Sequence, residues 1–409
     1  MSILDGLLDE AKWQEFLAYK IEKSNMSKVD EQRLIDFVSN KEYASIASAI
    51  MDGSYTFSLP KKSLVNKSGS TKKRVVYSYS ESESWILKFI LHQMAKYDSV
   101  FPSNLFSFRR NLTVKKAFRS LVKNKGIDDM YAYKLDISNY FNSINIDVLL
   151  PILKKVLSDD KKLFEFISDL LTVDKSVYEG EVICEKRGAM AGTSISTFLA
   201  NVYLMEMDKY FLNKKIIYAR YSDDIIVFAP SLNKVKEYRK IMHSFVKLRG
   251  LTINEDKEEL FQPRSAWSFL GFEYNSGKVD LSKVTLKKIK DKIRRKARAL
   301  LRWRNKNSAT GEHAMKVMLR VFNNKFYRES NTKNLTWSKW FFPIINTHKT
   351  LEEIDDYLIQ YLRYVTSGKF NKKNYNITYS DLKDLGFRSL VHEFYKFKDA
   401  DKKLAVKES

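Results

Sequence analysis

Apolar residues recur at helical spacing near the start of the chain and alternate as in strands closer to its middle. Within residues 1–54, Leu4, Leu7 and Trp13 belong to a series of apolar positions at near-helical intervals. Such positions line one face of a helix, so this N-terminal segment is predicted to be helical. Residues 131–137 instead alternate between apolar and polar side chains, which predicts a strand.

The segment from 55 to 275 contains stretches with helical spacing and stretches with the alternation of strands. It begins with a stretch rich in Lys, Ser, Val and Tyr over 55–79, which predicts a basic hairpin. This mixed order is typical of an α+β layer structure in which helices pack on a small antiparallel sheet. Helices are predicted over 81–96, 114–125, 146–158, 161–171 and 194–212, and a strand pair over 215–230.

From 276 to 409 the chain is predicted to be helical and strongly basic. Eleven of the twenty positions from 287 to 306 are Lys or Arg, against a single acid, Asp291. Ile289 and Ile293 belong to one apolar stripe, so the charge is displayed on the opposite face. The chain therefore divides into an N-terminal helical segment, a mixed region and a basic helical region.

The charge balance narrows the class of partner. The 409 residues include 72 Lys and Arg against 49 Asp and Glu, a formal net charge of +23. Such an excess is typical of proteins that bind a polyanion, either nucleic acid or an anionic membrane surface. No apolar run reaches the roughly 18 residues of a spanning helix, and the acidic N-terminus does not resemble a signal peptide, which favours the cytoplasm and no membrane partner. A single cysteine, Cys184, excludes an intramolecular disulfide and a cysteine-based zinc site.

Two adjacent acids stand at the centre of the predicted strand pair. Runs of β-forming residues flank Ser222, Asp223 and Asp224, so both carboxylates are expected at the tip of a hairpin. Adjacent carboxylates repel one another and resist desolvation. A divalent cation removes both problems, because Mg²⁺ prefers carboxylate oxygens and keeps positions open for substrate phosphates. An ordinary Asx-type turn is the alternative interpretation.

A third acid and a small-residue loop favour the metal interpretation. Asp136 lies near the end of the apolar strand over 131–137, where it would complete the site. Two metals would then clamp the attacking and leaving oxygens of a phosphoryl transfer. Residues 188–197 are mostly small and open a helix, a surface that admits close approach of a sugar-phosphate or a base pair.

In order and spacing, these three segments resemble motifs A, B and C of the reverse transcriptase palm. Residues 221–224 match the Tyr-x-Asp-Asp signature of motif C, and Asp136 matches the motif A metal ligand. Residues 200–204 match the Leu-Ala-Asn-x-Tyr-Leu tail of motif B. The resemblance extends over roughly residues 65–274: 106–111 resembles the fingers segment Tyr-Gly-Phe-Arg, 251–257 resembles motif D, and 269–272 resembles the primer-grip turn.

The resemblance implies a right-hand polymerase, with reverse transcriptase fingers and palm over 55–275 and a helical thumb after them. It implies an RNA-directed DNA polymerase that takes dNTPs and an RNA template and makes a DNA product. Two Mg²⁺ would be held by the catalytic residues Asp136, Asp223 and Asp224, with the Ile137 carbonyl as a further ligand.

Further roles are implied by the same resemblance. Phe141, five residues after Asp136, takes the position of the steric gate that excludes a ribose 2′-hydroxyl. Lys257 takes the place of the motif D residue that donates a proton to pyrophosphate. The remaining candidates are the nucleotide-binding residues Lys72, Arg74, Arg109 and Gly192 and the nucleic-acid-binding residues Arg294, Arg295 and Arg298 of the thumb.

Three features distinguish the chain within this family. Met190, Ala191 and Gly192 stand where the family has Pro-Gln-Gly, so the glutamine contact to template or incoming nucleotide is missing. The Asn-Ala-x-x-His and Val-Thr-Gly markers of retron enzymes are absent. Residues 379–390 resemble the helical tail of bacterial defence-associated reverse transcriptases, the unknown-group and Abi-like enzymes. The resemblance therefore predicts cDNA synthesis from a dedicated non-coding RNA in antiphage defence.

Other functions fit the same sequence. The same palm would also serve template-independent or protein-primed DNA synthesis, and the 23 Tyr supply many candidate hydroxyls. A catalytically silent RNA-binding module is the alternative from a different class, and the intact Asp136, Asp223 and Asp224 argue against it. A homo-oligomer is compatible with the sequence.

Overall fold

The structure is a computed structural model that describes residues 2–23, 26–66, 73–327 and 336–407. The chain divides into two compact units, Met1–Ser265 and Ala266–Ser409, each with its own sheet and helices. The division falls before the strands that flank the predicted primer-grip turn, so residues 269–272 belong to the second unit.

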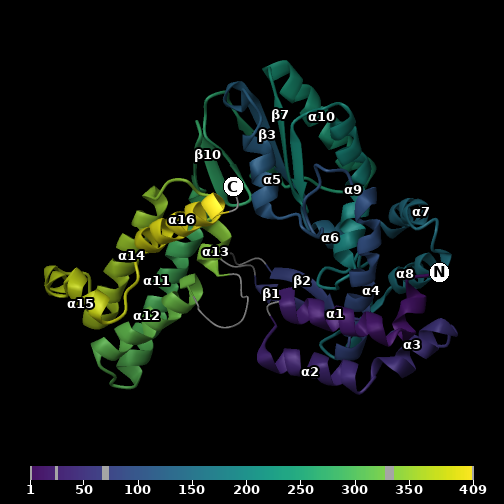
Figure 1. The fold of residues 1–409 in the computed structure, drawn as a ribbon, viewed down its shortest axis with the longest axis horizontal. Coiled ribbons are helices and arrows are strands. Elements are labelled where there is room, and N and C mark those ends of the chain that lie inside the picture. The colour runs from purple at the N-terminus through teal and green to yellow at the C-terminus, as the bar shows by residue number, and fades with distance from the viewer. Residues whose placement is uncertain (1, 24–25, 67–72, 328–335, 408–409) are drawn as a thin grey trace. The chain divides into compact units, whose positions relative to one another are not determined.

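The first unit contains an antiparallel sheet in the order β6-β7-β3-β8, which lies beside α5 and α10 (Figure 1). The two central strands, β3 and β7, are almost entirely buried because the helices α9 and α10 pack against the sheet. Burial on both faces explains why the β7 run is continuously apolar. The strands predicted over 131–137 and 215–230 are confirmed as β3 (Tyr131–Asp136), β6 (Tyr218–Tyr221) and β7 (Asp224–Ala229), with β8 (Glu259–Phe261) at one edge and the helices α9 (Ser196–Asn213) and α10 (Leu232–Leu248) on the sheet.

A second sheet, in the order β2-β1-β4-β5, contains the predicted basic hairpin. Its first two strands are antiparallel, and Lys61 also pairs in parallel with Val177 of a second hairpin. The sequence patterns did not predict that second hairpin, because each of its strands has only four residues and shows no clear alternation of apolar and polar positions. The strands are β1 (Lys61–Asn66), β2 (Lys73–Ser78), β4 (Lys175–Tyr178) and β5 (Glu181–Cys184).

The N-terminal helices are joined to α4 (Glu81–Gln93) by a cluster of aromatic rings. The buried ring of Trp13 stacks on Tyr43 and Phe89, with centroids 4.5 and 4.1 Å apart. The predicted helical segment is confirmed, and residues 40–42 form a turn between α2 and α3. The elements are η1 (Leu4–Leu8), α1 (Glu10–Lys23), α2 (Lys28–Ser39) and α3 (Tyr43–Met51).

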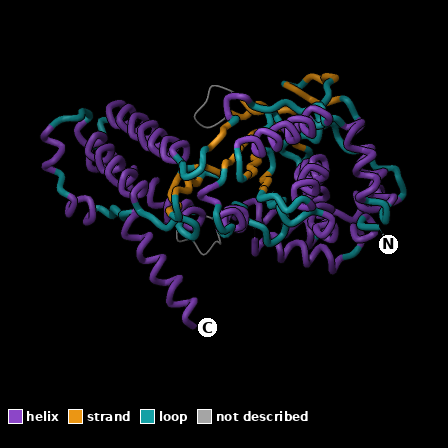
Figure 2. Tube along the Cα trace, turned by 90° about the horizontal axis from the view of Figure 1, so that it is seen from above, coloured by secondary structure: helices purple, strands orange, loops and turns teal. Residues whose placement is uncertain are grey.

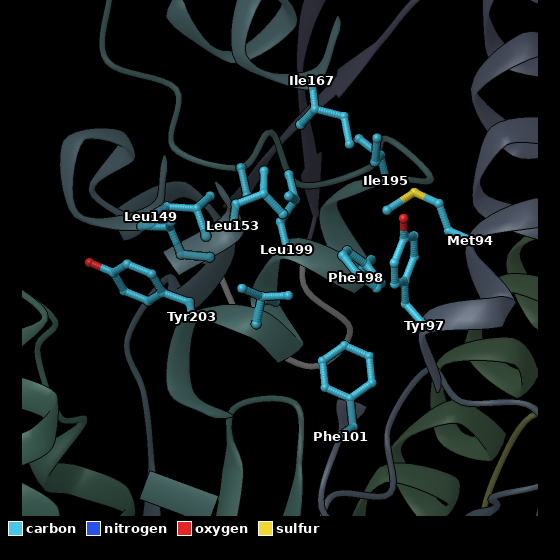
Figure 3. Packing of buried hydrophobic residues seen from close by; sticks show 14 of the residues in the cluster. Met94, Tyr97, Phe101, Leu149, Leu153, Ile167, Ile195, Phe198, Leu199 and Tyr203 are labelled. Carbon is cyan, nitrogen blue, oxygen red and sulfur yellow. The ribbon is translucent and has the colours of Figure 1, made fainter. Parts of the chain in front are cut away.

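Helix α9 is buried on most of its sides by the other helices of the first unit. The ring of Phe198 lies 6.3 Å from that of Tyr97 and 5.4 Å from that of Phe101, while Leu199 and Tyr203 lie near α7 (Figure 3). This packing fixes the helix that follows the small-residue loop. The remaining elements are η2 (Met94–Val100), α5 (Val114–Val122), η3 (Ile127–Asp129), α6 (Tyr140–Ser143), α7 (Ile146–Val156), α8 (Lys161–Thr172) and η4 (Glu255–Lys257).

The second unit combines an antiparallel sheet, in the order β11-β10-β9, with a group of helices. The helices α11, α12 and α14 pack side by side (Figures 1 and 2), and Ile289 and Ile293 of α11 are buried, as the apolar stripe predicted. Within the described residues, no helix has the length and apolar character needed to cross a membrane. The elements are β9 (Trp267–Phe269), β10 (Phe272–Asn275), β11 (Lys278–Leu281), α11 (Lys283–Lys306), α12 (Gly311–Tyr327), α13 (Trp337–Phe341), α14 (Lys349–Ser367), η5 (Lys372–Asn376), α15 (Tyr379–Asp384) and α16 (Leu390–Lys407).

Candidate active site

Three acids meet at one end of the β6-β7-β3-β8 sheet of the first unit. Asp136 is the last residue of β3 and stands opposite Asp224, the first residue of β7. Asp223 lies in the two-residue turn between β6 and β7, where Ser222 adopts a left-handed φ of 63°. The Asp223 carbonyl accepts a hydrogen bond from Ile137 N at 3.3 Å, which ties the turn to the end of β3. Strand register and a tight turn therefore bring together acids that are far apart in the sequence.

These carboxylates are close enough to alter one another's protonation. Burial raises the pKa of Asp223, and the charge of Asp136 raises it further. Burial, followed by the charges of Asp223 and Asp136, raises the pKa of Asp224 to about 6. The neighbouring carboxylates therefore disfavour ionisation of Asp223 and Asp224, as expected for a cluster that is short of positive charge.

One lysine supplies part of that positive charge. Lys257 Nζ donates to Asp136 Oδ1 at 2.7 Å, and Asn254 Nδ2 donates to the same oxygen at 3.2 Å. The backbone holds this arrangement, because Asn254 N also donates to the Asp136 carbonyl at 2.8 Å. Burial lowers the pKa of Lys257, but the hydrogen bond and charge of Asp136 outweigh it and raise that pKa overall. The segment that resembles motif D thus contacts the predicted metal ligand of motif A.

The donor set fits a hard divalent cation. Carboxylate oxygens are the ligands that Mg²⁺ prefers, and a cation relieves the repulsion between clustered like charges. Within the described part of the chain, no three Asp, Glu, His or Cys side chains are already arranged to hold a metal ion, and the Lys257 ammonium takes a cation's place at Asp136. No described group donates to the Ile137 carbonyl, so that oxygen remains available as a ligand.

A buried ion pair holds β6 of the same hairpin close to its turn, where Arg220 stands opposite Ile225. The side chains of Arg220 in β6 and Asp208 in α9 are both 0% exposed, with Nη2 and Oδ2 2.5 Å apart and Nε and Oδ1 2.8 Å apart. Tyr218 donates its hydroxyl to Asp208 at 2.8 Å. Arg220 also donates to the Asn201 carbonyl at 3.1 Å and to the Ser222 carbonyl at 3.4 Å, which ties the pair to the turn. Sequence analysis missed Arg220, although an arginine inside an apolar strand is a visible signal.

Phe141 belongs to an aromatic group that includes the first residue of the Tyr-x-Asp-Asp signature. The ring of Phe108 lies 6.1 Å from that of Phe141 and 6.5 Å from that of Tyr221, and Phe108 is 49% exposed at a left-handed φ of 55°. Phe141 itself is partly exposed, as contact with a sugar requires. The neighbouring Tyr140 is buried and donates its hydroxyl to the Ala200 carbonyl at 2.6 Å. The geometry therefore favours Phe141 over Tyr140 as the ring that contacts a sugar.

The small-residue loop is fixed by β2 and by Asn142, a residue that sequence analysis did not single out. Asn142 accepts from Ala191 N at 2.9 Å and donates to the Val75 carbonyl at 3.1 Å, and Tyr77 N donates to the Ala191 carbonyl at 2.7 Å. A Cβ on Gly192, where φ is 106°, would lie 2.7 Å from the Tyr77 carbonyl oxygen. Glycine is therefore needed at this position for the chain to pack on itself. Its nucleotide contact stays a prediction.

The other predicted nucleotide-binding residues have different surroundings. Arg109 is almost fully buried and donates to the Asp98 carboxylate and to backbone carbonyls of the same loop, which favours a structural role over a nucleotide contact. Arg74 is exposed on β2, where a phosphate can reach it. Lys72 lies outside the described residues.

The predicted nucleic-acid-binding arginines of the second unit lie on α11. Arg295 and Arg298 are exposed. Arg294 is less exposed and donates from Nη2 to Asp291 at 2.7 Å. Of the three, Arg295 and Arg298 are therefore the more available to a phosphate backbone.

The antiparallel sheet presents clustered acids at one end, and the loop that opens α9 is fixed against the β1–β2 hairpin. This arrangement is that of the palm of a nucleic-acid polymerase. A family model described as reverse transcriptase (RNA-dependent DNA polymerase) matches residues 59–274, just over half of the chain. The chain belongs to this family. The predicted α+β reverse transcriptase fold and the enzyme class, an RNA-directed DNA polymerase, are confirmed.

The curated relatives are bacterial reverse transcriptases. The retron Ec86 reverse transcriptase of Escherichia coli is 24% identical over 238 residues, which cover 56% of this chain and 67% of that protein. The retron Ec48 reverse transcriptase of Escherichia coli is 26% identical over 231 residues, which cover 55% of this chain and 53% of that protein. Among solved structures, the apo telomerase of Candida tropicalis truncated from its C-terminal domain has 14% sequence identity and a TM-score of 0.45, over 60% of each chain. The predicted resemblance to bacterial reverse transcriptases is confirmed.

Proposed function

We propose that this chain copies an RNA template into DNA at the site formed by Asp136, Asp223 and Asp224. The observation that carries the proposal is the register of β3 and β7, which sets Asp136 opposite Asp224 with Asp223 in the adjoining turn. The three carboxylates and the Ile137 carbonyl hold two Mg²⁺. When bound, the ions supply positive charge to the phosphate oxygens as a primer 3′-hydroxyl attacks the α-phosphate of a dNTP.

The surrounding side chains orient the nucleotide and move a proton. Phe141 lies against the incoming sugar and excludes a 2′-hydroxyl. Lys257, a cation at the edge of the acid cluster, donates a proton to the pyrophosphate leaving group. Arg74, exposed on β2, contacts a phosphate as a bidentate donor.

Replacing two acids at once tests the site. Asp223→Asn with Asp224→Asn is expected to abolish nucleotide incorporation in primer extension, while circular dichroism and RNA binding remain as in the wild type. Fold and binding survive because the change removes like charges from one cluster. Asp256→Asn is the matched control, since it neutralises an exposed acid next to Lys257. If the double variant extends primers at the wild-type rate, this hairpin is not the active site.

The exposed arginines of α11 support a contact with the phosphate backbone of the template and product. Neutralising Arg294, Arg295 and Arg298 is expected to weaken binding and to flatten its salt dependence by about 0.9 in the log–log slope for each phosphate that the variant no longer neutralises. Arg294 contributes least because it already pairs with Asp291. Binding isotherms at several salt concentrations measure the slope, and an unchanged slope would remove α11 from the nucleic-acid interface.

The template we propose is a dedicated non-coding RNA, and the cellular role is antiphage defence in the cytoplasm. Support comes from the likeness to two retron reverse transcriptases and from the resemblance of residues 379–390 to defence-associated enzymes. The missing glutamine at Ala191 favours the alternative of untemplated or protein-primed synthesis. Sequencing the DNA that co-purifies with the chain decides between them, because an RNA complement supports copying and a homopolymer contradicts it.

A further inference from the structure

A cavity in the first unit lies apart from the acid cluster. Its volume is about 540 Å³, within the range of pockets that hold small organic ligands. The end of α3, the segment that leads into β1, the end of β2 and one face of α8 line it, together with Arg187. Asp136, Asp223 and Asp224 do not contribute to its wall.

Arg187 is the feature of this cavity that packing does not explain. The residue is 4% exposed, yet no described carboxylate lies within ion-pair distance of its guanidinium. It donates to the Val173 carbonyl, to the Tyr79 hydroxyl and, from Nη1, to the Met190 thioether at 3.1 Å. Sulfur is a weak acceptor, and a buried charge without a counterion is costly. The wall of the cavity is therefore short of one negative charge.

A second donor points to the same thioether. The Tyr79 hydroxyl donates to Met190 Sδ at 3.4 Å. Burial raises the pKa of Tyr79 to about 12, although the charge of Arg187 lowers it, so the hydroxyl keeps its proton at neutral pH. An oxyanion placed here would accept from both Arg187 and Tyr79 with far stronger hydrogen bonds than the sulfur allows.

Aromatic rings make up another part of the wall. Phe57 lies edge to face with Tyr55, Tyr79 and Phe166, with ring centroids 5.2, 5.6 and 5.6 Å apart. All four residues line the cavity. Such rings bind planar bases of any sequence by stacking.

The rim of the cavity limits the charge of its ligand. Asp52, Glu165 and Asp169 are exposed acids at the rim, against one exposed cation, Lys162. Three carboxylates repel a triphosphate, but they accept hydrogen bonds from the exocyclic amine of a base. The charges therefore fit a ligand that has an amine-bearing base and one phosphate.

We propose that this cavity binds a nucleotide unit with a single phosphate, with its base against Phe57 and Phe166 and its phosphate oxygens accepting from Arg187 and Tyr79. A free nucleoside monophosphate and a nucleotide of an RNA strand share this chemistry. Met190 belongs to the loop that precedes α9, so a bound phosphate that takes Arg187 from Met190 connects the cavity to that loop. The site shares no side chain with the acid cluster and does not depend on the proposed catalysis.

Calorimetric titration of the full chain with AMP, GMP, UMP, ATP and a short RNA, in EDTA, tests the proposal. AMP and GMP, or the RNA if the unit belongs to a strand, are expected to bind to the wild type and to the Asp223→Asn, Asp224→Asn variant alike. UMP and ATP are expected to bind more weakly than AMP. Phe166→Ala is expected to weaken binding about tenfold and Tyr79→Phe about fivefold. Arg187→Gln is expected to abolish it.

The control is Tyr97→Phe, which removes a hydroxyl that donates to Asp159 at 2.8 Å outside the cavity and leaves binding unchanged. If Arg187→Gln does not fold, Phe166→Ala and Tyr79→Phe decide the question by themselves. If both variants weaken monophosphate binding, the cavity binds a free nucleotide. If no monophosphate binds and both variants weaken RNA binding, the cavity binds a nucleotide of an RNA strand. The proposal is overturned if no monophosphate binds and the affinity for RNA is the same in the wild type and both variants. It is also overturned if a monophosphate binds with an affinity that neither substitution changes.

Discussion

The β6–β7 hairpin holds its charges in two opposite ways. On β6, two residues before Ser222, Arg220 forms a one-to-one ion pair with Asp208 of α9, and this pair is fully buried. At the tip, three carboxylates share the ammonium of Lys257, and burial raises the pKa of two of them. A buried charge that already has its partner gains little from a further ion, whereas clustered like charges are stabilised by a cation. The comparison separates architecture from function within one hairpin.

Arg187 extends the comparison to a cation. It is buried like Arg220, but Arg220 has a carboxylate partner and two carbonyls, whereas Arg187 has one carbonyl, one thioether and one hydroxyl and no carboxylate among the described residues. The two arginines are buried to a similar degree, but of the two only Arg220 has a described carboxylate as its counterion. An incomplete partner set, rather than burial, is therefore what distinguishes a binding group from a structural one.

The largest effect is expected from breaking the buried pair. Arg220→Ala leaves the Asp208 carboxylate buried without its counterion, so the free energy of unfolding is expected to fall by about 3–5 kcal/mol. Arg220→Met with Asp208→Leu is expected to recover most of that loss, because the uncompensated charge is gone. Urea unfolding at pH 7 measures both variants.

An exposed ion pair provides the control for this experiment. Arg264 and Asp129 are 2.8 Å apart, with side chains 80% and 63% exposed, so Arg264→Ala is expected to change the free energy of unfolding very little. An Arg220→Ala variant that loses no more stability than Arg264→Ala would show that the buried pair does not hold the hairpin.

At the tip the sign of the effect reverses. The pKa of Asp224 is about 6 in the folded chain, above its ordinary value of 3.8, so the folded state binds more protons between about pH 4 and pH 6. Stability therefore falls as the pH rises through that window. Asp224→Asn removes the penalty and is expected to raise the free energy of unfolding by roughly 2 kcal/mol at pH 7. Unfolding at pH 4 is the comparison, since an equal gain there would mean that ionisation is not the cause.

Sequence reasoning found the tip because its residues are marked locally. Asp136, Asp223 and Asp224 are acids at the ends of apolar strands, and the register of those strands follows from their alternation. The buried pair is marked only in part. Arg220 is visible as an arginine in an apolar strand, but its partner Asp208 lies in helix α9, and nothing in the sequence gives the distance between the two side chains.

The roles of individual arginines were the hardest to predict from the sequence. Arg109 stands in a segment that resembles the fingers motif, yet the folded loop brings Asp98 within 2.9 Å of its Nε. Arg187 drew no attention, because its unpaired state becomes visible only once the surrounding walls are in place. A long cationic side chain can reach many partners, so its role depends on tertiary structure rather than on its neighbours in sequence.

A third expected effect concerns the ring beside the acids. In the proposed site a 2′-hydroxyl would overlap the Phe141 ring or displace it, and packed contacts of this kind cost about 1–3 kcal/mol. Since 1.4 kcal/mol is tenfold, Phe141→Ala is expected to raise the ratio of rNTP to dNTP incorporation by roughly ten- to a hundredfold. Single-nucleotide extension on one primer–template measures the ratio.

Tyr140→Phe is the matched control for the sugar gate. It removes the hydroxyl that donates to the Ala200 carbonyl, so it is expected to lower stability by about 1 kcal/mol and to leave the nucleotide ratio unchanged. A ratio that changes in Tyr140→Phe and not in Phe141→Ala would transfer the gate from the partly exposed ring to the buried one.

The smallest effect is expected at Lys257, and it tests whether the tip is a cation site at all. The lysine side chain is 58% exposed, so its ion pair with Asp136 contributes less than about 1 kcal/mol to stability. Its ammonium nevertheless competes for the oxygen that a metal would use, and its charge lowers the pKa of Asp223 and of Asp224. Lys257→Met keeps the side-chain length and removes the competitor.

Mg²⁺ titration without nucleic acid is therefore expected to show binding a few-fold tighter in Lys257→Met above pH 7, where the carboxylates are ionised. Nucleotide incorporation is expected to slow, because the proton donor is lost, and the acid limb of its pH profile is expected to move to higher pH. Tighter metal binding together with slower turnover separates competition from catalysis in one variant. Weaker Mg²⁺ binding would instead mean that Lys257 holds Asp136 in its ligand position, as Arg220 holds Asp208, and the acid cluster and the buried pair would then be alike.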